Sequence, residues 1–171
     1  MPLTNLLITG LPGVGKTTLI RNLCGDLKHL NPVGFYTSEI REAGVRTGFE
    51  LITLDNRRGL LSHVDISSRH RVGKYGVDIA GFEAFLDGLD FLNPSHKMAV
   101  IDEIGKMECM SGRFTALVRQ LLDSDRPVLA TIALKGGGFI AEVKERPDVK
   151  LFELTTANRN NLGSEIETAL N

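Results

Sequence analysis

The chain has 171 residues and a formal net charge of −1 at pH 7. This length suits one domain with a sizeable core. The charge balance argues against nucleic acid as the main partner. No apolar run is long enough to span a bilayer, and the glycine-rich segment at Gly10 comes too early to leave room for a signal peptide. We therefore expect a single cytoplasmic domain over residues 1–171, with no membrane partner. The sequence leaves the oligomeric state open, and a monomer is plausible.

The two cysteines, Cys24 and Cys109, lie far apart and show no C-x-x-C spacing. This pattern favours buried thiols over a disulfide or a metal site. A reducing cytoplasm fits that usage best.

Short apolar runs alternate with helix-period stripes, which predicts an α/β fold with a largely parallel sheet. Strands are expected at 6–9, 33–40, 48–54, 60–66, 97–101, 128–133 and 150–154. Helices are expected at 18–30, 82–89, 114–122, 139–146 and 162–170, with Ser111 as a cap for the third. The strands at 33–40 and 48–54 flank a turn at 42–44. They predict an antiparallel hairpin beside the parallel strands.

Residues 10–17 read GLPGVGKT and match the phosphate-loop pattern G-x-x-x-x-G-K-[ST]. An apolar run precedes the loop and a helical stripe follows it. The loop therefore lies at a helix N-terminus, where free backbone N–H groups face an anion. Lys16 would reach the β and γ phosphates, and the Thr17 hydroxyl would bind Mg²⁺. The residues expected to contact the nucleotide here are Gly10, Leu11, Pro12, Gly13, Val14, Gly15, Lys16, Thr17 and Thr18.

A second motif follows the apolar run at 98–101, where Asp102 and Glu103 end a predicted strand. In phosphate-loop enzymes an acid in this position helps to hold Mg²⁺, a role that fits Asp102. Glu103 is the candidate general base, because a neighbouring carboxylate can accept the proton of an attacking water. The alternative is that the two acids only cap the next helix. Lys106 either neutralises charge on the γ-phosphate, as an arginine finger does, or is a solvated surface lysine.

Five segments of the chain together resemble the THEP1-type nucleoside-triphosphatases. They are residues 10–17, 34–41, 71–77, 102–108 and 158–159. The resemblance implies a RecA-like phosphate-loop NTPase fold with three α/β/α layers. It also implies Mg²⁺-dependent hydrolysis of ATP, GTP and other nucleoside triphosphates to the diphosphate and phosphate. In such folds a further strand lies between the phosphate-loop strand and the acid-bearing strand, and residues 128–133 are expected to form it.

The resemblance also assigns contacts outside the phosphate loop. It implies nucleotide contacts by Asp102, Glu103, Ile104, Gly105, Lys106, Asn158 and Arg159. Asn158 and Arg159 would lie near the base; the alternative is an ordinary loop in which Asn158 caps the final helix. Thr131 near the end of its strand is a candidate contact to the γ-phosphate or the attacking water.

Several alternatives stay open at this point. The basic cluster Arg69 to Lys74 is either a lid that meets phosphates or a solvated loop. Glu39, Arg41 and Arg46 on the predicted hairpin either form cross-strand ion pairs or line the nucleotide cleft. Asp102-x-x-Gly105 matches a GTPase pattern, but the sequence contains no Asn-Lys-x-Asp guanine motif. The predicted function is a nucleoside-triphosphatase with low base specificity. A nucleoside or nucleotide kinase is the alternative, and a GTPase switch and a nucleotide-dependent binding module are weaker ones.

Overall fold

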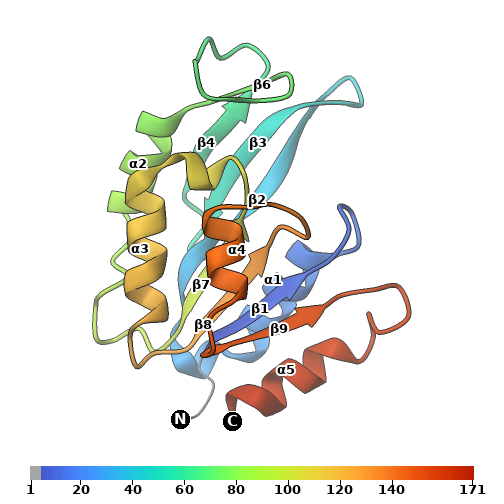
Figure 1. The fold of residues 1–171 in the computed structure, drawn as a ribbon, viewed down its shortest axis with the longest axis vertical. Helices are drawn as coiled ribbons and strands as arrows, with labels where there is room; N and C mark the ends of the chain where they lie inside the picture. The colour runs from blue at the N-terminus through green and yellow to red at the C-terminus, as the bar shows by residue number, and fades with distance from the viewer. Residues whose placement is uncertain (1–4) are drawn as a thin grey trace.

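The computed structural model describes residues 5–171 (Figure 1). The strands are β1 (Asn5–Thr9), β2 (Val33–Glu42), β3 (Val45–Thr53), β4 (Arg58–His63), β5 (Arg71–Val72), β6 (Tyr75–Val77), β7 (Ala99–Ile104), β8 (Val128–Ile132) and β9 (Val149–Glu153). The α-helices are α1 (Lys16–Asp26), α2 (Ile79–Asp87), α3 (Gly112–Leu122), α4 (Phe139–Lys144) and α5 (Leu162–Leu170). Two short 3₁₀ turns, η1 (Lys28–Leu30) and η2 (Glu108–Met110), complete the elements of the described chain.

All strands of residues 5–171 join one sheet in the order β5-β6-β4-β3-β2-β7-β8-β1-β9. Neighbours from β2 to β9 pair in parallel, and β8 lies between β7 and β1 as predicted. The predicted hairpin is also present, because β2 and β3 pair antiparallel. Its turn residues Ala43 and Gly44 both have positive φ, as the tight hairpin turns that match strand twist require. Strand β4, which corresponds to the strand expected at 60–66, extends this antiparallel part, and β6 and β5, which were not predicted, extend it further.

Helices cover both faces of the sheet, which confirms the predicted three-layer α/β/α fold with its parallel strands and antiparallel hairpin. Helices α2, α3 and α4 contribute to one apolar core, and α1 and α5 contribute to the other. Strand β1, which lies between β8 and β9, contributes to both cores, with Leu7 in the first and Leu6 and Ile8 in the second. A strand that is buried on both faces reads as an unbroken apolar run, and this explains the sequence of β1.

The helix boundaries follow local signals. Ser111 caps α3, because its Oγ accepts a hydrogen bond from the Phe114 N–H at 3.1 Å. Helix α1 begins two residues earlier than predicted, at Lys16, and ends at Asp26. Strand β7 extends through both acids to Ile104, and the peptide bond between Asp102 and Glu103 is cis.

Within residues 5–171, no helix combines the length and apolar character needed to cross a membrane. Cys24 and Cys109 are half-buried and unpaired. Burial raises the pKa of Cys24 to about 11 and that of Cys109 to about 12, so both thiols are neutral at physiological pH. Neither thiol forms a disulfide, as expected, but both are half-buried and not fully buried. One sheet runs through most of the described chain, and the single domain over 1–171 stays a prediction.

Candidate active site

The phosphate loop follows the carboxyl end of β1 and leads directly into α1. Gly13 and Gly15 have φ values of 77° and 110°, a region that side chains with a Cβ rarely adopt. A Cβ on Gly10 would come within 2.7 Å of the Leu154 carbonyl oxygen, so the loop also needs glycine for close approach. The Lys16 ammonium donates to the Gly10 carbonyl at 2.9 Å. The loop therefore has the curved backbone that phosphate binding needs, and the hydrogen bond to Gly10 holds the Lys16 side chain against the loop.

Asp102 lies at the bottom of the site, where it is almost fully buried and accepts three hydrogen bonds. Its Oδ2 accepts from the Thr17 hydroxyl at 2.7 Å and from the Thr37 backbone N–H at 3.3 Å. Its Oδ1 accepts from the Thr131 hydroxyl at 2.5 Å. Burial raises the pKa of Asp102, and these three donors partly offset that rise. Asp102, which lies on β7, is thus hydrogen-bonded to α1, β2 and β8.

A β-bulge explains how two neighbouring acids reach the same cleft. Successive side chains of a regular strand point to opposite faces. In β7, Ile101 pairs with Ala130 and Ile104 pairs with Ile132, so two residues of β7 oppose Thr131 alone. Both Asp102 and Glu103 consequently line the cleft.

Glu103 faces the phosphate loop. Its Oε2 lies 3.5 Å from the Lys16 Nζ, and its side chain is about one third exposed. Burial raises the pKa of Glu103, while the Lys16 ammonium opposes that rise. The proposed general base and the lysine that would bind the terminal phosphate therefore lie next to each other in the cleft.

Glu108 is a third carboxylate that the motif analysis did not single out. It is buried in η2, and its Oε2 accepts the Gly105 backbone N–H at 3.1 Å. A Cβ on Gly105 would lie 2.6 Å from the Glu103 Oε1 and 2.8 Å from the Glu108 Oε2, so glycine is what lets the two carboxylates converge. Burial, with the nearby charge of Glu103, raises the pKa of Glu108 to about 8. The only sequence signal for it is its place in the 102–108 run.

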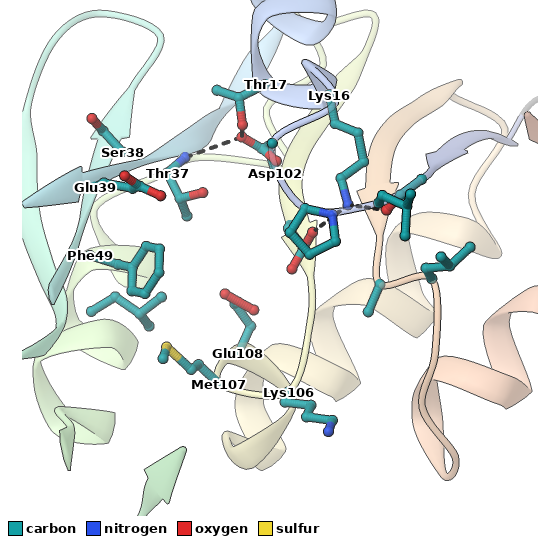
Figure 2. Close-up of a pocket in the computed structure, with 18 of the residues that line it drawn as sticks. Lys16, Thr17, Thr37, Ser38, Glu39, Phe49, Asp102, Lys106, Met107 and Glu108 are labelled. Carbon is teal, nitrogen blue, oxygen red and sulfur yellow. Dashed lines mark hydrogen bonds and ion pairs between the residues drawn. The ribbon is translucent and has the colours of Figure 1, made fainter. Parts of the chain in front are cut away.

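The cleft has a volume of about 790 Å³, within the usual range for ligand pockets. Figure 2 shows Phe49 and Met107 on the side of it opposite Lys16. The predicted residues that line it are Gly10, Leu11, Pro12, Gly13, Gly15, Lys16, Thr17, Thr18, Asp102, Glu103 and Lys106. Residues that the motifs missed also line it, namely Thr37, Ser38, Phe49, Leu61, Val72, Met107, Glu108, Ala133, Leu134 and Lys135.

Three predicted nucleotide contacts turn inward instead of lining the cleft. Val14 packs against the core that α1 covers, and Ile104 is fully buried in the other core. Gly105 presents only its N–H, which is already given to Glu108. The side chains of Val14 and Ile104 are therefore not placed to touch a ligand, and contacts through the backbone of these three residues stay a prediction.

The predicted base-contacting loop lies outside the cleft. Asn158 closes its own turn, because its Oδ1 accepts from the Thr155 N–H at 2.8 Å and its Nδ2 donates to the Glu153 carbonyl at 2.7 Å. Its side chain does not cap α5, whose N-cap is Asn161. Arg159 is exposed. The cleft lining includes neither Asn158 nor Arg159.

Thr131 and Lys106, two further candidates for contacts to the γ-phosphate, differ in burial and in hydrogen bonding. Thr131 is buried, and its hydroxyl is committed to Asp102 instead of facing a phosphate. Lys106 is exposed, and Figure 2 shows it pointing away from Asp102. Among the described residues it forms no ion pair and donates no side-chain hydrogen bond.

Charged residues of the predicted hairpin both form ion pairs and line the cleft. Glu39 pairs with Arg41 at 2.7 Å and with Arg46 at 3.2 Å, while Glu39 and Arg46 also line the cleft. In the basic cluster at 69–74, the Arg71 guanidinium donates to the Lys74 carbonyl at 2.8 Å. That cluster contributes only Val72 to the cleft lining.

The comparisons with known proteins agree with this arrangement. A family model described as NTPase matches residues 5–167. The chain is 45% identical to nucleoside-triphosphatase THEP1 of Thermotoga sp. (strain RQ2), covering 96% of this chain and 94% of that protein. It is 41% identical to the human cancer-related nucleoside-triphosphatase, covering 97% and 96% of the two chains.

Solved structures match as closely. The crystal structure of THEP1 from Aquifex aeolicus superposes with a TM-score of 0.84 at 35% identity, covering 97% of this chain and 98% of that one. The solution structure of the human cancer-related nucleoside triphosphatase gives a TM-score of 0.81 at 40% identity, covering 97% and 96%. The cleft geometry and these matches lead to one conclusion: the chain is an enzyme, a hydrolase, and belongs to the NTPase family of THEP1-type proteins.

Proposed function

We propose that this chain hydrolyses nucleoside triphosphates to the diphosphate and phosphate, with water as the nucleophile. The observation that carries the proposal is the 3.5 Å approach between the Lys16 Nζ and the Glu103 Oε2. Lysine in this motif reaches the β and γ phosphates, so a carboxylate beside it stands next to the bond to be broken. The relatives described above are named nucleoside-triphosphatases, and nothing in the comparisons favours the kinase alternative.

Glu103 then acts as the general base. The water oxygen bonds to the γ-phosphorus, the bond from that phosphorus to the β–γ bridging oxygen breaks, and Glu103 accepts the water proton. Burial raises the pKa of Glu103, which makes it a better proton acceptor than an exposed glutamate. Lys16 moves from Glu103 and Gly10 to the phosphates when the nucleotide binds.

Thr17 and Asp102 are the proposed ligands of Mg²⁺. Their oxygens lie 2.7 Å apart at the bottom of the cleft, and hard oxygen donors are what Mg²⁺ prefers. Within residues 5–171 no cluster of three His, Cys, Asp or Glu side chains is arranged as a metal cage, which suits a cation that substrate phosphates and water mainly hold. The bound cation would neutralise charge that develops on the phosphates.

Low base specificity is part of the proposal. The cleft lining supplies backbone and side-chain groups for phosphates, and the predicted base contacts Asn158 and Arg159 lie outside it. We also propose a cytoplasmic location, which the two unpaired half-buried thiols support.

The test is phosphate release from ATP, GTP, CTP and UTP with Mg²⁺, using the wild type and Glu103→Gln. The variant should bind nucleotide and lose on the order of 10²–10⁴-fold in kcat. Glu145→Gln is the matched control, because this glutamate is exposed just after α4 and lies outside the cleft. A Glu103→Gln variant with near wild-type turnover would remove Glu103 from its proposed role.

A further inference from the structure

The cleft extends well past the phosphate loop, across four further strands of the sheet. From β1 the order runs through β8 and β7 to β2 and β3. Lys16 therefore lies at one end of the cleft and Glu103 near its middle, while Phe49 on β3 lies at the far end. Three phosphate groups held by the loop and Lys16 would occupy only the near end, which leaves the far end available to a different group.

We name this far end the hairpin compartment, which is lined by Thr37, Glu39, Arg46, Phe49, Val72 and Met107. Phe49 is half-buried, and Figure 2 shows it facing into the cleft on the same side as Met107. Phe49, Val72 and Met107 give it apolar walls, while Glu39 supplies a charged acceptor. An apolar pocket with a few convergent polar groups is the usual form of a small-molecule site.

The polar groups of the compartment are held in place. The Arg46 guanidinium stands 5.1 Å from the Phe49 ring centre, and its Nε donates to the Tyr75 hydroxyl at 2.9 Å. Hydrogen bonds from Arg41 and Arg46 lower the pKa of Glu39, so its carboxylate is ionised and accepts hydrogen bonds only. A ligand beside it must therefore carry N–H or O–H donors.

The reaction geometry excludes the base of the hydrolysed nucleotide from this compartment. In phosphoryl transfer the attacking and leaving oxygens lie roughly in line with the phosphorus. With Glu103 holding the water, the leaving diphosphate and its nucleoside extend away from the Glu103 side of the γ-phosphate. The hairpin compartment lies beyond Glu103 on that nucleophile side.

We propose that the hairpin compartment binds the planar heteroaromatic base of a second molecule, a nucleoside or nucleotide distinct from the triphosphate being hydrolysed. The ring stacks on Phe49, and the amine, ring N–H or ribose hydroxyl groups donate to Glu39. This proposal rests on the proposed function, because the position of the second ligand is inferred from the role of Glu103 as the general base of hydrolysis.

The experiment is calorimetric titration of adenosine, guanosine, cytidine and uridine into protein carrying Mg²⁺ and one equivalent of β,γ-imido-ATP. At least one nucleoside should bind the wild type. Phe49→Leu keeps an apolar side chain but removes the aromatic face, and it should weaken that binding by about 5- to 150-fold, the range for one stacked base. Glu39→Gln should weaken it as well.

Phe139→Leu is the matched control, since Phe139 is also half-buried beneath an arginine, with Arg119 4.8 Å from its ring centre, and lies outside the cleft. It should leave nucleoside binding unchanged. Thermal unfolding of both variants verifies that they are folded.

Two results overturn the proposal. The first is that no nucleoside binds the wild type at millimolar concentration, or that Phe49→Leu binds as the wild type does. The second is that Phe49→Leu raises KM for ATP but not for inorganic triphosphate, which would put the substrate's own base in the compartment. A separate titration of β,γ-imido-ATP into the free protein and the Glu103→Gln assay test the proposed function, so either proposal can fail without the other.

Discussion

We expect Glu108 to make the stability of this fold depend on pH. The side chain is buried, with 5% of its surface exposed, and accepts one hydrogen bond, from the Gly105 N–H. Burial and the Glu103 charge raise its pKa from the usual 4.5 to about 8. The folded state therefore holds this proton more tightly than the unfolded chain does. The resulting stability is fully present below about pH 4.5 and is lost as the pH rises through 8.

The size of the effect follows from the shift. One pKa unit is worth about 1.4 kcal/mol, so ionising Glu108 costs the fold about 5 kcal/mol in total. About 3 to 4 kcal/mol of this falls between pH 5 and pH 8. Glu108→Gln cannot ionise, yet its amide oxygen can still accept the Gly105 N–H. Relative to the wild type, the variant should gain that amount of stability over the same interval.

The assay is urea unfolding of both proteins at pH 5, 6, 7 and 8, without nucleotide and with a chelator. With an m-value of about 2 kcal/mol/M, the difference in midpoint should widen by about 1.5 to 2 M. Glu145→Gln, an exposed substitution of the same kind, should show no such widening. A Glu108→Gln difference that stays constant within about 1 kcal/mol from pH 5 to pH 8 would refute the reasoning.

Three further substitutions probe the site. Thr131→Val removes the buried donor to the Asp102 Oδ1 at nearly constant volume; urea unfolding should show a loss of about 1.5 to 3 kcal/mol, and an unchanged midpoint would contradict this. Gly105→Ala puts a methyl group within 2.6 Å of the Glu103 Oε1; steady-state kinetics should show a lower kcat with KM nearly unchanged, whereas a rise in KM alone would argue against it. Lys106→Ala should lower kcat by less than about tenfold, because the side chain is exposed; a loss of 10³ or more would instead identify a finger.

The sequence by itself determined the features that local chemistry controls. The phosphate loop could be recognised in the sequence because its glycines, Lys16 and Thr17 lie within eight consecutive residues. The helix and strand periods indicated the α/β class, and the resemblance to a known family placed β8 correctly between β7 and β1. The pair Asp102 and Glu103 was also found, since a strand that ends in acids is itself a local pattern.

Only the tertiary structure decided how distant segments meet. The bulge opposite Thr131 directs both acids into the cleft, and the spacing of apolar residues in the sequence does not predict a bulge. Asn158 satisfies its own loop instead of facing the cleft. Phe49 is an ordinary strand aromatic in sequence, and it becomes part of a pocket because β3 pairs with β2 beside the acid-bearing strand. Glu108 has its high pKa only because folding buries it near Glu103. Burial and charge proximity depend on contacts between segments that the chain order does not specify.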